Sequence, residues 1–300
     1  MKNIRIITWG GLGDAAIISP SFKAIKEKYT KSRLIVYANK LHRQLYEHNP
    51  HIDSLQSISP ILNPAGYVLK RLKPEEFVYV NYGHWKPSIY YRGIHAMQTV
   101  GEMLGLKIKD PVAQVFLSDK ENQWAVDALR PYKIPVLLQI TSTCSSNQDW
   151  PFENWEKLIA KMPHIDFIQV GLENEPKIKG AISFLGKTSI RESLALLNNS
   201  SSFIAVESFF NNVSSAFNAP GVVLFGPSTP ANWGYSNNIN LHNEKLTCSP
   251  CIDILRDRTC PYGKECMATI SVDRVQAALE KQLSKQMKGY NKDKPHVLTI

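Results

Sequence analysis

Four cysteines lie close together near the end of this 300-residue chain, and a fifth, Cys144, stands apart. The spacing is Cys248, two residues, Cys251, eight residues, Cys260, five residues and Cys266. Four thiolates at such a spacing can surround one tetrahedral metal ion, and both zinc and iron accept four sulfurs. Because four sulfurs leave no open position for substrate, the site would be structural. In a reducing compartment we expect metal ligation, with two disulfides or free thiols as the alternatives.

A glycine-rich turn, residues 10–14, follows the first apolar run and ends in Asp14. Glycines let the backbone approach a ligand closely, and the start of a helix favours an anion or a carboxylate. The spacing fits neither the G-x-G-x-x-G dinucleotide fingerprint nor a P-loop. Asp14 either takes part in chemistry or caps the helix, and the motif alone does not decide.

Hydroxyl groups cluster in residues 141–146, which we call the hydroxyl loop. Hydroxyls and backbone N–H groups near a helix start can cradle a diphosphate, and a solvated helix cap is the alternative. A later apolar run ends in Glu207 and Ser208, ahead of the proline-rich residues 226–230. A carboxylate there can bind the hydroxyls of a sugar or ribose, or it can serve as an ordinary cap.

Short apolar runs alternate with helical patterns along the whole chain, which predicts parallel sheets. We expect strands at residues 4–9, 33–38, 77–81, 136–140, 167–170, 203–206 and 221–225. We expect helices at residues 14–29, 41–48, 91–104, 118–130, 152–162, 192–197 and 212–217. Ligands of such sheets bind beyond the carboxyl ends of the strands, where the candidate residues above are found.

The pattern starts afresh near residues 131–135. The sequence therefore predicts an α/β protein with two Rossmann-like domains, residues 1–132 and 133–285, followed by a basic tail at 286–300. One doubly wound domain with insertions is the alternative. A hydrophobic content of 43% suffices for packed cores, so disorder is not expected.

The opening apolar run is interrupted by the glycine-rich turn well short of a membrane-spanning length. We therefore expect a cytoplasmic protein without a secretion signal. The formal net charge of +9 indicates an anionic partner, and a membrane surface, a phosphorylated glycan, a nucleotide and nucleic acid all fit.

Several segments occur in a specific order along the chain: IRIITWGGLGDAAIISPSFKAIKEKYTKSRLIVYAN, QDWPFENWEKLI, FLGKTSIRESLALLNNSSSFIAVES and LFGPSTPANWGY. In this order they resemble the heptosyltransferases of glycosyltransferase family 9, and the resemblance covers most of the chain. CSPC, TCPYGKECM and the helical residues 272–283 resemble the cysteine-bearing tail of many members. The cysteine spacing is similar to the iron-holding finger of autotransporter protein heptosyltransferases.

The resemblance implies a GT-B fold, with two facing Rossmann-like domains, the acceptor on the first and the nucleotide sugar on the second. It implies transfer of a sugar, a heptose from ADP-heptose, to a hydroxyl of a lipopolysaccharide core or of a protein. Asp14 would be the general base of this inverting reaction, which would need no catalytic divalent cation. Association with the inner membrane and with further copies of the chain are expectations from the same reasoning.

The resemblance also implies which residues bind the donor. Thr143, with its neighbours Ser142 and Ser145, would meet the charge of the leaving diphosphate, and Glu175 would bind the ribose. The full set of expected donor-binding residues is Gly13, Ser142, Thr143, Gln148, Gly171, Glu175, Glu207, Ser208 and Asn212.

The chain also departs from the family pattern. Gln148 replaces a lysine, Glu207 an aspartate, Phe209 a glycine and Asn212 a histidine. Because the lysine is absent, a positive charge expected near the donor phosphates is missing. Phe209 leaves less space than glycine for the backbone to approach the diphosphate. Two other functions therefore stay open. One is a binding protein that kept the fold without the chemistry, and the other is a glycosyltransferase that acts on modified nucleic acid.

Overall fold

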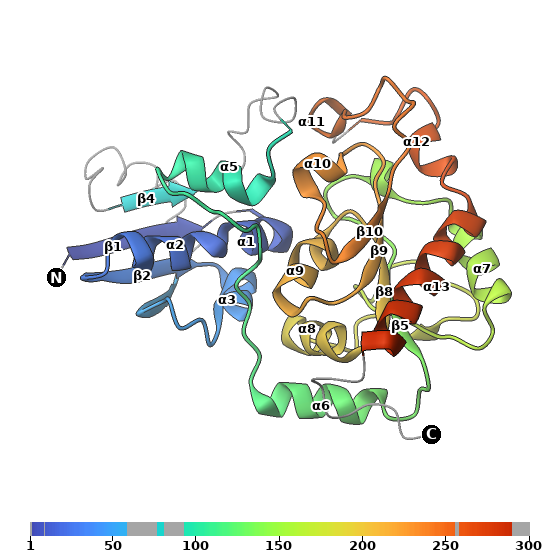
Figure 1. The fold of residues 1–300 in the computed structure, drawn as a ribbon, viewed down its shortest axis with the longest axis horizontal. Coiled ribbons are helices and arrows are strands. Elements are labelled where there is room, and N and C mark those ends of the chain that lie inside the picture. Colours follow the sequence, from blue (N-terminus) through green and yellow to red (C-terminus); the bar gives the residue numbers. More distant parts are fainter. Residues whose placement is uncertain (1, 9, 59–76, 81–92, 256–257, 290–300) are drawn as a thin grey trace. The chain divides into compact units, whose positions relative to one another are not determined.

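The computed structural model of the protein describes residues 2–8, 10–58, 77–80, 93–255 and 258–289 (Figure 1). The chain divides into two compact units, Met1–Ser118 and Asp119–Ile300. Each unit is built on its own parallel sheet, which confirms the predicted α/β class.

The first unit has a four-stranded sheet in the order β3-β2-β1-β4. Its central strand β1 is rich in isoleucine, and Ile6 is fully buried, as are Leu34 and Val36 of β2. The elements of this unit, in chain order, are β1 (Lys2–Thr8), α1 (Leu12–Ile18), α2 (Pro20–Lys28), β2 (Ser32–Ala38), α3 (Lys40–Tyr46), β3 (Ser54–Ser57), β4 (Phe77–Val80) and α5 (Ala96–Met103).

The single helix expected at residues 14–29 is two helices. Helix α1 ends at Ile18 and α2 begins at Pro20, the first position of a helix, where a missing N–H costs nothing. Ser19 between them still donates its backbone N–H to Ala15 and Ala16. The predicted ends at residues 9, 81, 91 and 92 lie outside the described residues.

The second unit has a six-stranded sheet in the order β10-β9-β8-β5-β6-β7, with every pair parallel. Its elements begin with α6 (Asp119–Leu129), β5 (Pro135–Gln139), the 3-10 turn η4 (Ser146–Gln148), α7 (Phe152–Lys161), β6 (Asp166–Gln169), β7 (Ile182–Ser183) and α8 (Ile190–Asn199). They continue with β8 (Ser202–Val206), α9 (Phe209–Phe217), β9 (Gly221–Leu224), α10 (Pro230–Trp233), β10 (Asn238–Leu241), α11 (Ile252–Leu255), α12 (Glu265–Ala268) and α13 (Val272–Gly289).

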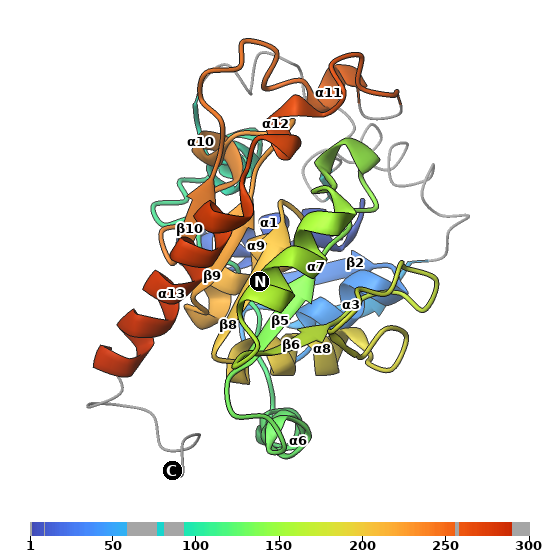
Figure 2. The same ribbon diagram turned by 90° about the vertical axis from the view of Figure 1, so that its right-hand side faces the viewer.

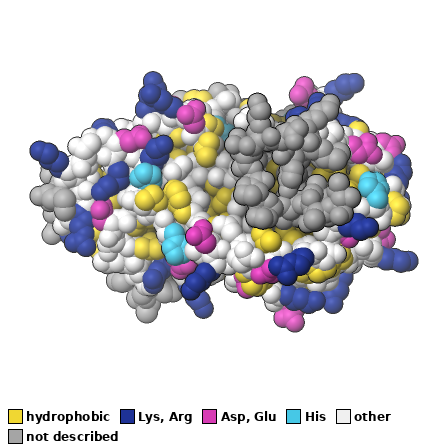
Figure 3. All heavy atoms as spheres, turned by 60° about the horizontal axis from the view of Figure 1, so that its bottom comes forward, with side chains coloured by type: hydrophobic (Ala, Val, Ile, Leu, Met, Phe, Trp, Pro, Cys, Tyr) yellow, Lys and Arg dark blue, Asp and Glu magenta, His cyan; other side chains and the backbone are white. Residues whose placement is uncertain are grey.

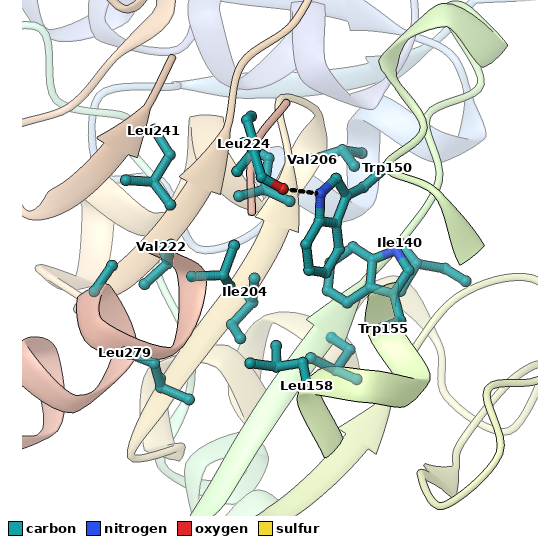
Figure 4. Close-up of a cluster of buried hydrophobic side chains, with 14 of the residues drawn as sticks. Ile140, Trp150, Trp155, Leu158, Ile204, Val206, Val222, Leu224, Leu241 and Leu279 are labelled. Atoms are coloured by element: carbon teal, nitrogen blue, oxygen red, sulfur yellow. Dashed lines mark hydrogen bonds between the residues drawn. The ribbon is translucent and has the colours of Figure 1, made fainter. Parts of the chain in front are cut away.

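Helices cover both faces of this sheet. Helices α8 and α9 lie on one side, and α7 and α13 lie side by side on the other (Figures 1 and 2). Leu138, Ile204 and Val222 from three neighbouring strands point into the core under α7 and α13. In the same cluster, Trp150 and Trp155 pack edge to face, and the indole N–H of Trp150 donates to the carbonyl oxygen of Ile270 (Figure 4). The Trp-Pro motif therefore anchors α7 to the sheet.

Helix α6 packs against α8 and so belongs to the second unit. Arg191 on α8 donates two hydrogen bonds to the carboxylate of Glu121 on α6, at 2.6 and 2.7 Å. Such a two-point ion pair has a fixed geometry. The division by packing therefore comes earlier in the chain than the predicted boundary at residue 132. None of the helices in the described part of the chain has both the length and the apolar character that crossing a membrane requires.

Candidate functional site

The strand orders show where ligands of the two sheets are expected. In the first unit the order reverses between β1 and β4, and in the second it reverses between β5 and β8. A crevice forms at the carboxyl ends of the strands at such a switch point, and ligands bind there. The glycine-rich turn follows β1, and the hydroxyl loop and Glu207 follow β5 and β8. All three motifs found in the sequence therefore lie at switch points.

Asp14 and the glycine-rich turn are fitted to each other. The backbone N–H of Gly11 donates to Oδ2 of Asp14 at 2.7 Å, so the carboxylate does cap α1. Gly10 has a φ of +114°, and a Cβ added there would lie 2.3 Å from the same oxygen. Glycine is required at this position because the Asp14 carboxylate fills the space of a side chain. Asp14 itself is half-buried, and Gly13 precedes it in the first turn of α1.

The side chain of His42, on α3, makes hydrogen bonds to Gly10 of this turn and to Thr8 just before it. Its Nε2 lies 2.9 Å from the carbonyl oxygen of Gly10, and its Nδ1 lies 3.0 Å from Oγ1 of Thr8. A carbonyl oxygen only accepts, so Nε2 carries the hydrogen and the Thr8 hydroxyl donates to Nδ1. Burial lowers the pKa of His42, against the opposing effect of hydrogen bonds with the backbone of Gly10 and Gly11. Sequence reasoning missed His42, because no motif marks it.

Glu175 and Gly171, two of the expected donor-binding residues, contact each other beyond the end of β6. Thr141 donates its hydroxyl to Oε2 of Glu175 at 2.7 Å, and the backbone N–H of Leu172 donates to Oε1 at 2.8 Å. A Cβ on Gly171 would lie 2.5 Å from Oε1. The carboxylate of Glu175 is therefore held in one orientation at the boundary between the loops after β5 and β6.

Gln148 and Glu207 make hydrogen bonds to each other across the switch point of the second unit. The Gln148 amide nitrogen donates to the backbone carbonyl of Glu207 at 2.6 Å and to its Oε2 at 2.9 Å. Ser228 donates to the same Oε2 at 2.8 Å. Both Gln148 and Glu207 are buried, while Oε1 of Gln148 has no hydrogen-bond partner among the described residues. A neutral amide thus contacts the carboxylate from the position where the resemblance implied a cation.

Two further expected donor residues are engaged within the protein. Ser208 donates its hydroxyl to Oε1 of Gln139, the last residue of β5, at 2.6 Å. Asn212 is buried on α9, and its Oδ1 accepts from the hydroxyl of Tyr235 at 3.2 Å. Burial, followed by the nearby charge of Glu207, raises the pKa of Tyr235 well above its ordinary value. In this structure, Ser208 and Asn212 therefore both make hydrogen bonds within the protein near the switch point.

The hydroxyl loop is more open. Oγ of Ser142 accepts from the backbone N–H of Cys144 at 3.2 Å, and Oγ of Ser145 accepts from that of Asn147 at 3.3 Å. Because each hydroxyl accepts here, it can donate its own hydrogen to an anion. Thr143, between these two serines, is exposed to solvent.

A pocket with a volume of about 330 Å³ lies beside this loop in the second unit. Burial raises the pKa of Asp149 in its wall; Lys264 opposes this, and Glu175 adds to it. Residues on its wall include Thr141, Asp149, Trp150, Phe152, Pro176 and Lys264.

The four clustered cysteines are free thiols, as is Cys144. Burial raises the pKa of the Cys251 thiol, and the nearby Cys248 and Cys260 raise it further. Burial, followed by the nearby Cys251, also raises the pKa of Cys266, to about 11. Within the described ranges, however, no group of three or more His, Cys, Asp or Glu side chains is arranged to hold a metal ion. The metal site stays a prediction.

On the face of the molecule drawn in Figure 3, the Lys and Arg side chains are spread among Asp and Glu side chains.

The model of glycosyltransferase family 9 (heptosyltransferase) matches residues 91–264. No curated protein matches the chain by sequence. The fold is similar to that of a family 9 glycosyltransferase from Veillonella parvula, with 16% identity, a TM-score of 0.70 and coverage of 95% of this chain and 97% of that one.

Two Escherichia coli structures are also similar. ADP-heptose LPS heptosyltransferase II has 13% identity and a TM-score of 0.71, with coverage of 96% and 100% of the two chains. The iron-containing dodecameric glycosyltransferase TibC has 16% identity and a TM-score of 0.69, with coverage of 96% of this chain and 80% of TibC. TibC has also been solved with ADP-D-β-D-heptose. The predicted GT-B fold class is confirmed by these similarities.

Proposed function

Because the chain belongs to glycosyltransferase family 9, the heptosyltransferase family, we propose that it transfers a heptose from ADP-heptose to a hydroxyl of a lipopolysaccharide core or of a protein. The observation that carries the proposal is the Glu175 carboxylate, fixed at the end of β6 by Thr141 and Leu172. A carboxylate at that edge of the sheet can accept hydrogen bonds from both hydroxyls of a ribose. The donor bound to TibC supports the choice of ADP-heptose.

Asp14 is the general base of the proposed reaction. Its carboxylate accepts the proton of the acceptor hydroxyl while that oxygen attacks the anomeric carbon of the heptose. The bond between the anomeric carbon and the diphosphate oxygen breaks on the opposite side, so the configuration inverts and ADP leaves with the electron pair. The Gly11 N–H fixes the orientation of the carboxylate through Oδ2 before an acceptor arrives.

The hydroxyl loop stabilises the leaving group in this proposal. The hydroxyls of Ser142, Thr143 and Ser145 donate to the diphosphate oxygens as negative charge develops on them. Backbone N–H groups at the start of α9 add to this, because the N-terminus of a helix attracts anions.

We extend the proposal to the cysteines and infer that Cys248, Cys251, Cys260 and Cys266 hold iron or zinc. An all-sulfur donor set and the iron in TibC support this. The ion would order residues 248–266 and would supply no chemistry to the transfer itself.

The test is calorimetric titration of the purified protein with ADP, UDP and GDP. We expect selective binding of ADP, weakened at least tenfold by Glu175→Ala, because hydrogen bonds to a charged group contribute about 1.5–3 kcal/mol. Glu173→Ala, at an exposed position of the same loop, is the matched control. Asp14→Asn should bind ADP normally and lose about 100- to 10,000-fold in kcat for heptose transfer.

Other outcomes would point elsewhere. If none of the three nucleotides binds, the protein has kept the fold but no longer binds a nucleotide-sugar donor. Gln148 and Phe209 would then be the first residues to examine. If ADP binds but Asp14→Asn transfers heptose as fast as the wild type, then Asp14 is only a helix cap.

A further inference from the structure

The cysteine segment, residues 248–266, is tied directly to Asn147, the residue that follows the hydroxyl loop. Asn147 is buried, and its amide nitrogen donates to the carbonyl oxygens of Leu255 and Arg258, both at 2.8 Å. Its Oδ1 accepts from the backbone N–H of Cys260 at 3.3 Å. One side chain thus joins two segments more than 100 positions apart in the sequence.

Lys264 makes a further link between the same two segments. Its ammonium donates to the backbone carbonyl of Ser146, the last residue of the hydroxyl loop, at 2.6 Å. Lys264 has a φ of +57°, a left-handed conformation that few side chains adopt without cost, at the N-cap of α12. The turn therefore holds this side chain at the hydroxyl loop despite an unfavourable backbone conformation.

Charge makes Lys264 distinctive in the pocket. Among the described residues that line the 330 Å³ pocket, it is the only cation, and Thr141 of the hydroxyl loop also lines this pocket. An ammonium has three N–H donors, and the carbonyl of Ser146 takes one of them. Asp149 also lines the pocket.

We propose that Lys264, presented by the cysteine segment, supplies the positive charge that binds the diphosphate of the donor at the hydroxyl loop. This inference rests on the proposed function. Gln148 is uncharged and is held by Glu207, so the cation comes from a different segment of the chain. The cysteine segment then contributes directly to donor binding as well as to structure.

The experiment compares ADP with adenosine as calorimetric probes on the full-length, metal-analysed protein. Lys264→Asn removes the charge, and asparagine tolerates the left-handed backbone. We expect about 10- to 100-fold weaker ADP binding, because a charge-assisted hydrogen bond is lost, with adenosine binding unchanged. Lys264→Arg should stay within about threefold of the wild type for ADP, since it keeps the charge. Lys281→Asn on the exposed face of α13 is the matched control.

Measurements of thermal unfolding and metal content show whether a variant has lost stability or metal, as distinct from a specific loss of ADP binding. If Lys264→Asn unfolds early, Lys264→Gln, which keeps the aliphatic stem, takes its place. Unchanged ADP affinity in a folded neutral variant overturns the inference and leaves the proposed function standing. Equal loss for adenosine and ADP, or a folded Lys264→Arg as weak as Lys264→Asn, also overturns it. If the wild type binds none of ADP, UDP and GDP, both proposals fail together.

Discussion

The side-chain amide of Gln148 reaches both the backbone carbonyl and the carboxylate of Glu207, 59 positions further along the chain. The contact joins the loop after β5 to the end of β8. These are the two strands between which the strand order of the second unit reverses. Both residues are buried, so the two hydrogen bonds form where water cannot replace them.

Replacing Gln148 by alanine should therefore destabilise the protein. Oε2 of Glu207 would keep its bond from Ser228 but lose the one from Gln148, and we expect a decrease of about 1–3 kcal/mol in the free energy of unfolding. Urea denaturation measures this decrease. Gln276→Ala, which removes a solvent-exposed hydrogen bond to Glu280 on α13, should change the same free energy by less than about 0.5 kcal/mol. Equal effects of the two substitutions would show that the contact with Glu207 is unimportant.

Gly10→Ala should damage both the stability and the activity of the first unit. The added Cβ would lie 2.3 Å from Oδ2 of Asp14, so the carboxylate must move from its bond with Gly11. Gly105 also has a positive φ, +63°, but no atom of the described residues lies within 4 Å of an added Cβ. Gly105→Ala should thus cost only the backbone strain of about 1–2 kcal/mol, with kcat unchanged.

The comparison requires initial rates of ADP release together with urea unfolding. Gly10→Ala should lose more stability than Gly105→Ala and at least tenfold in kcat, since small displacements of a catalytic group are costly. A kcat equal to that of Gly105→Ala would contradict the proposed dependence of Asp14 on the glycine-rich turn.

Stability should depend on pH through His42. Burial lowers its pKa in the folded protein, so below about pH 6.5 the unfolded chain binds more protons than the folded one. The free energy of unfolding should therefore decrease as the pH falls through 6.5 and level off below the folded pKa. This part of the stability is fully present above pH 6.5.

Urea unfolding at a series of pH values from 8 to 5 tests this dependence for the wild type and His42→Gln. The difference between the two should shrink as the pH falls, because only the wild type loses the contribution of a buried neutral imidazole. His164→Gln, at an exposed position, should run parallel to the wild type throughout. Parallel curves for His42→Gln would rule out the assigned role.

Metal content should depend on the clustered cysteines and not on Cys144. Cys266→Ser should reduce the content from about one ion per chain to near zero and lower the unfolding temperature, since one of four ligands is lost. Cys144→Ser should retain the ion. Elemental analysis of the purified variants decides this, and wild-type protein without iron or zinc would end the proposal.

The sequence predicted the inner strands well and several edge strands poorly. β5, β8 and β9 are runs of almost entirely buried residues, and the isoleucines of β1 are buried as well, which the hydrophobic pattern detects. Three strands were missed, and all lie at sheet edges: β3, β7 and β10. They are short, with partly exposed residues, and their polar composition gives no strand pattern.

The candidate site was predictable in its parts and unpredictable in its connections. Asp14 with its glycines and Gly171 with Glu175 each lie within one short segment, and the sequence identified all of them as candidate site residues. The bonds of Gln148 and Asn147 join loops that are distant in sequence, so only the order of strands brings them together. The sequence showed that a lysine is missing at position 148, but not where another cation approaches.

The contacts of Asn147 and Lys264 also define which parts of this protein can be exchanged as a module. Grafting residues 141–147 alone into a relative would leave Asn147 without the carbonyls of Leu255 and Arg258. Transplanting residues 248–266 alone would leave Lys264 without its hydrogen bond to the carbonyl oxygen of Ser146. A functional chimera must carry both segments together, and substitutions accumulating in one segment should be matched by compensating substitutions in the other.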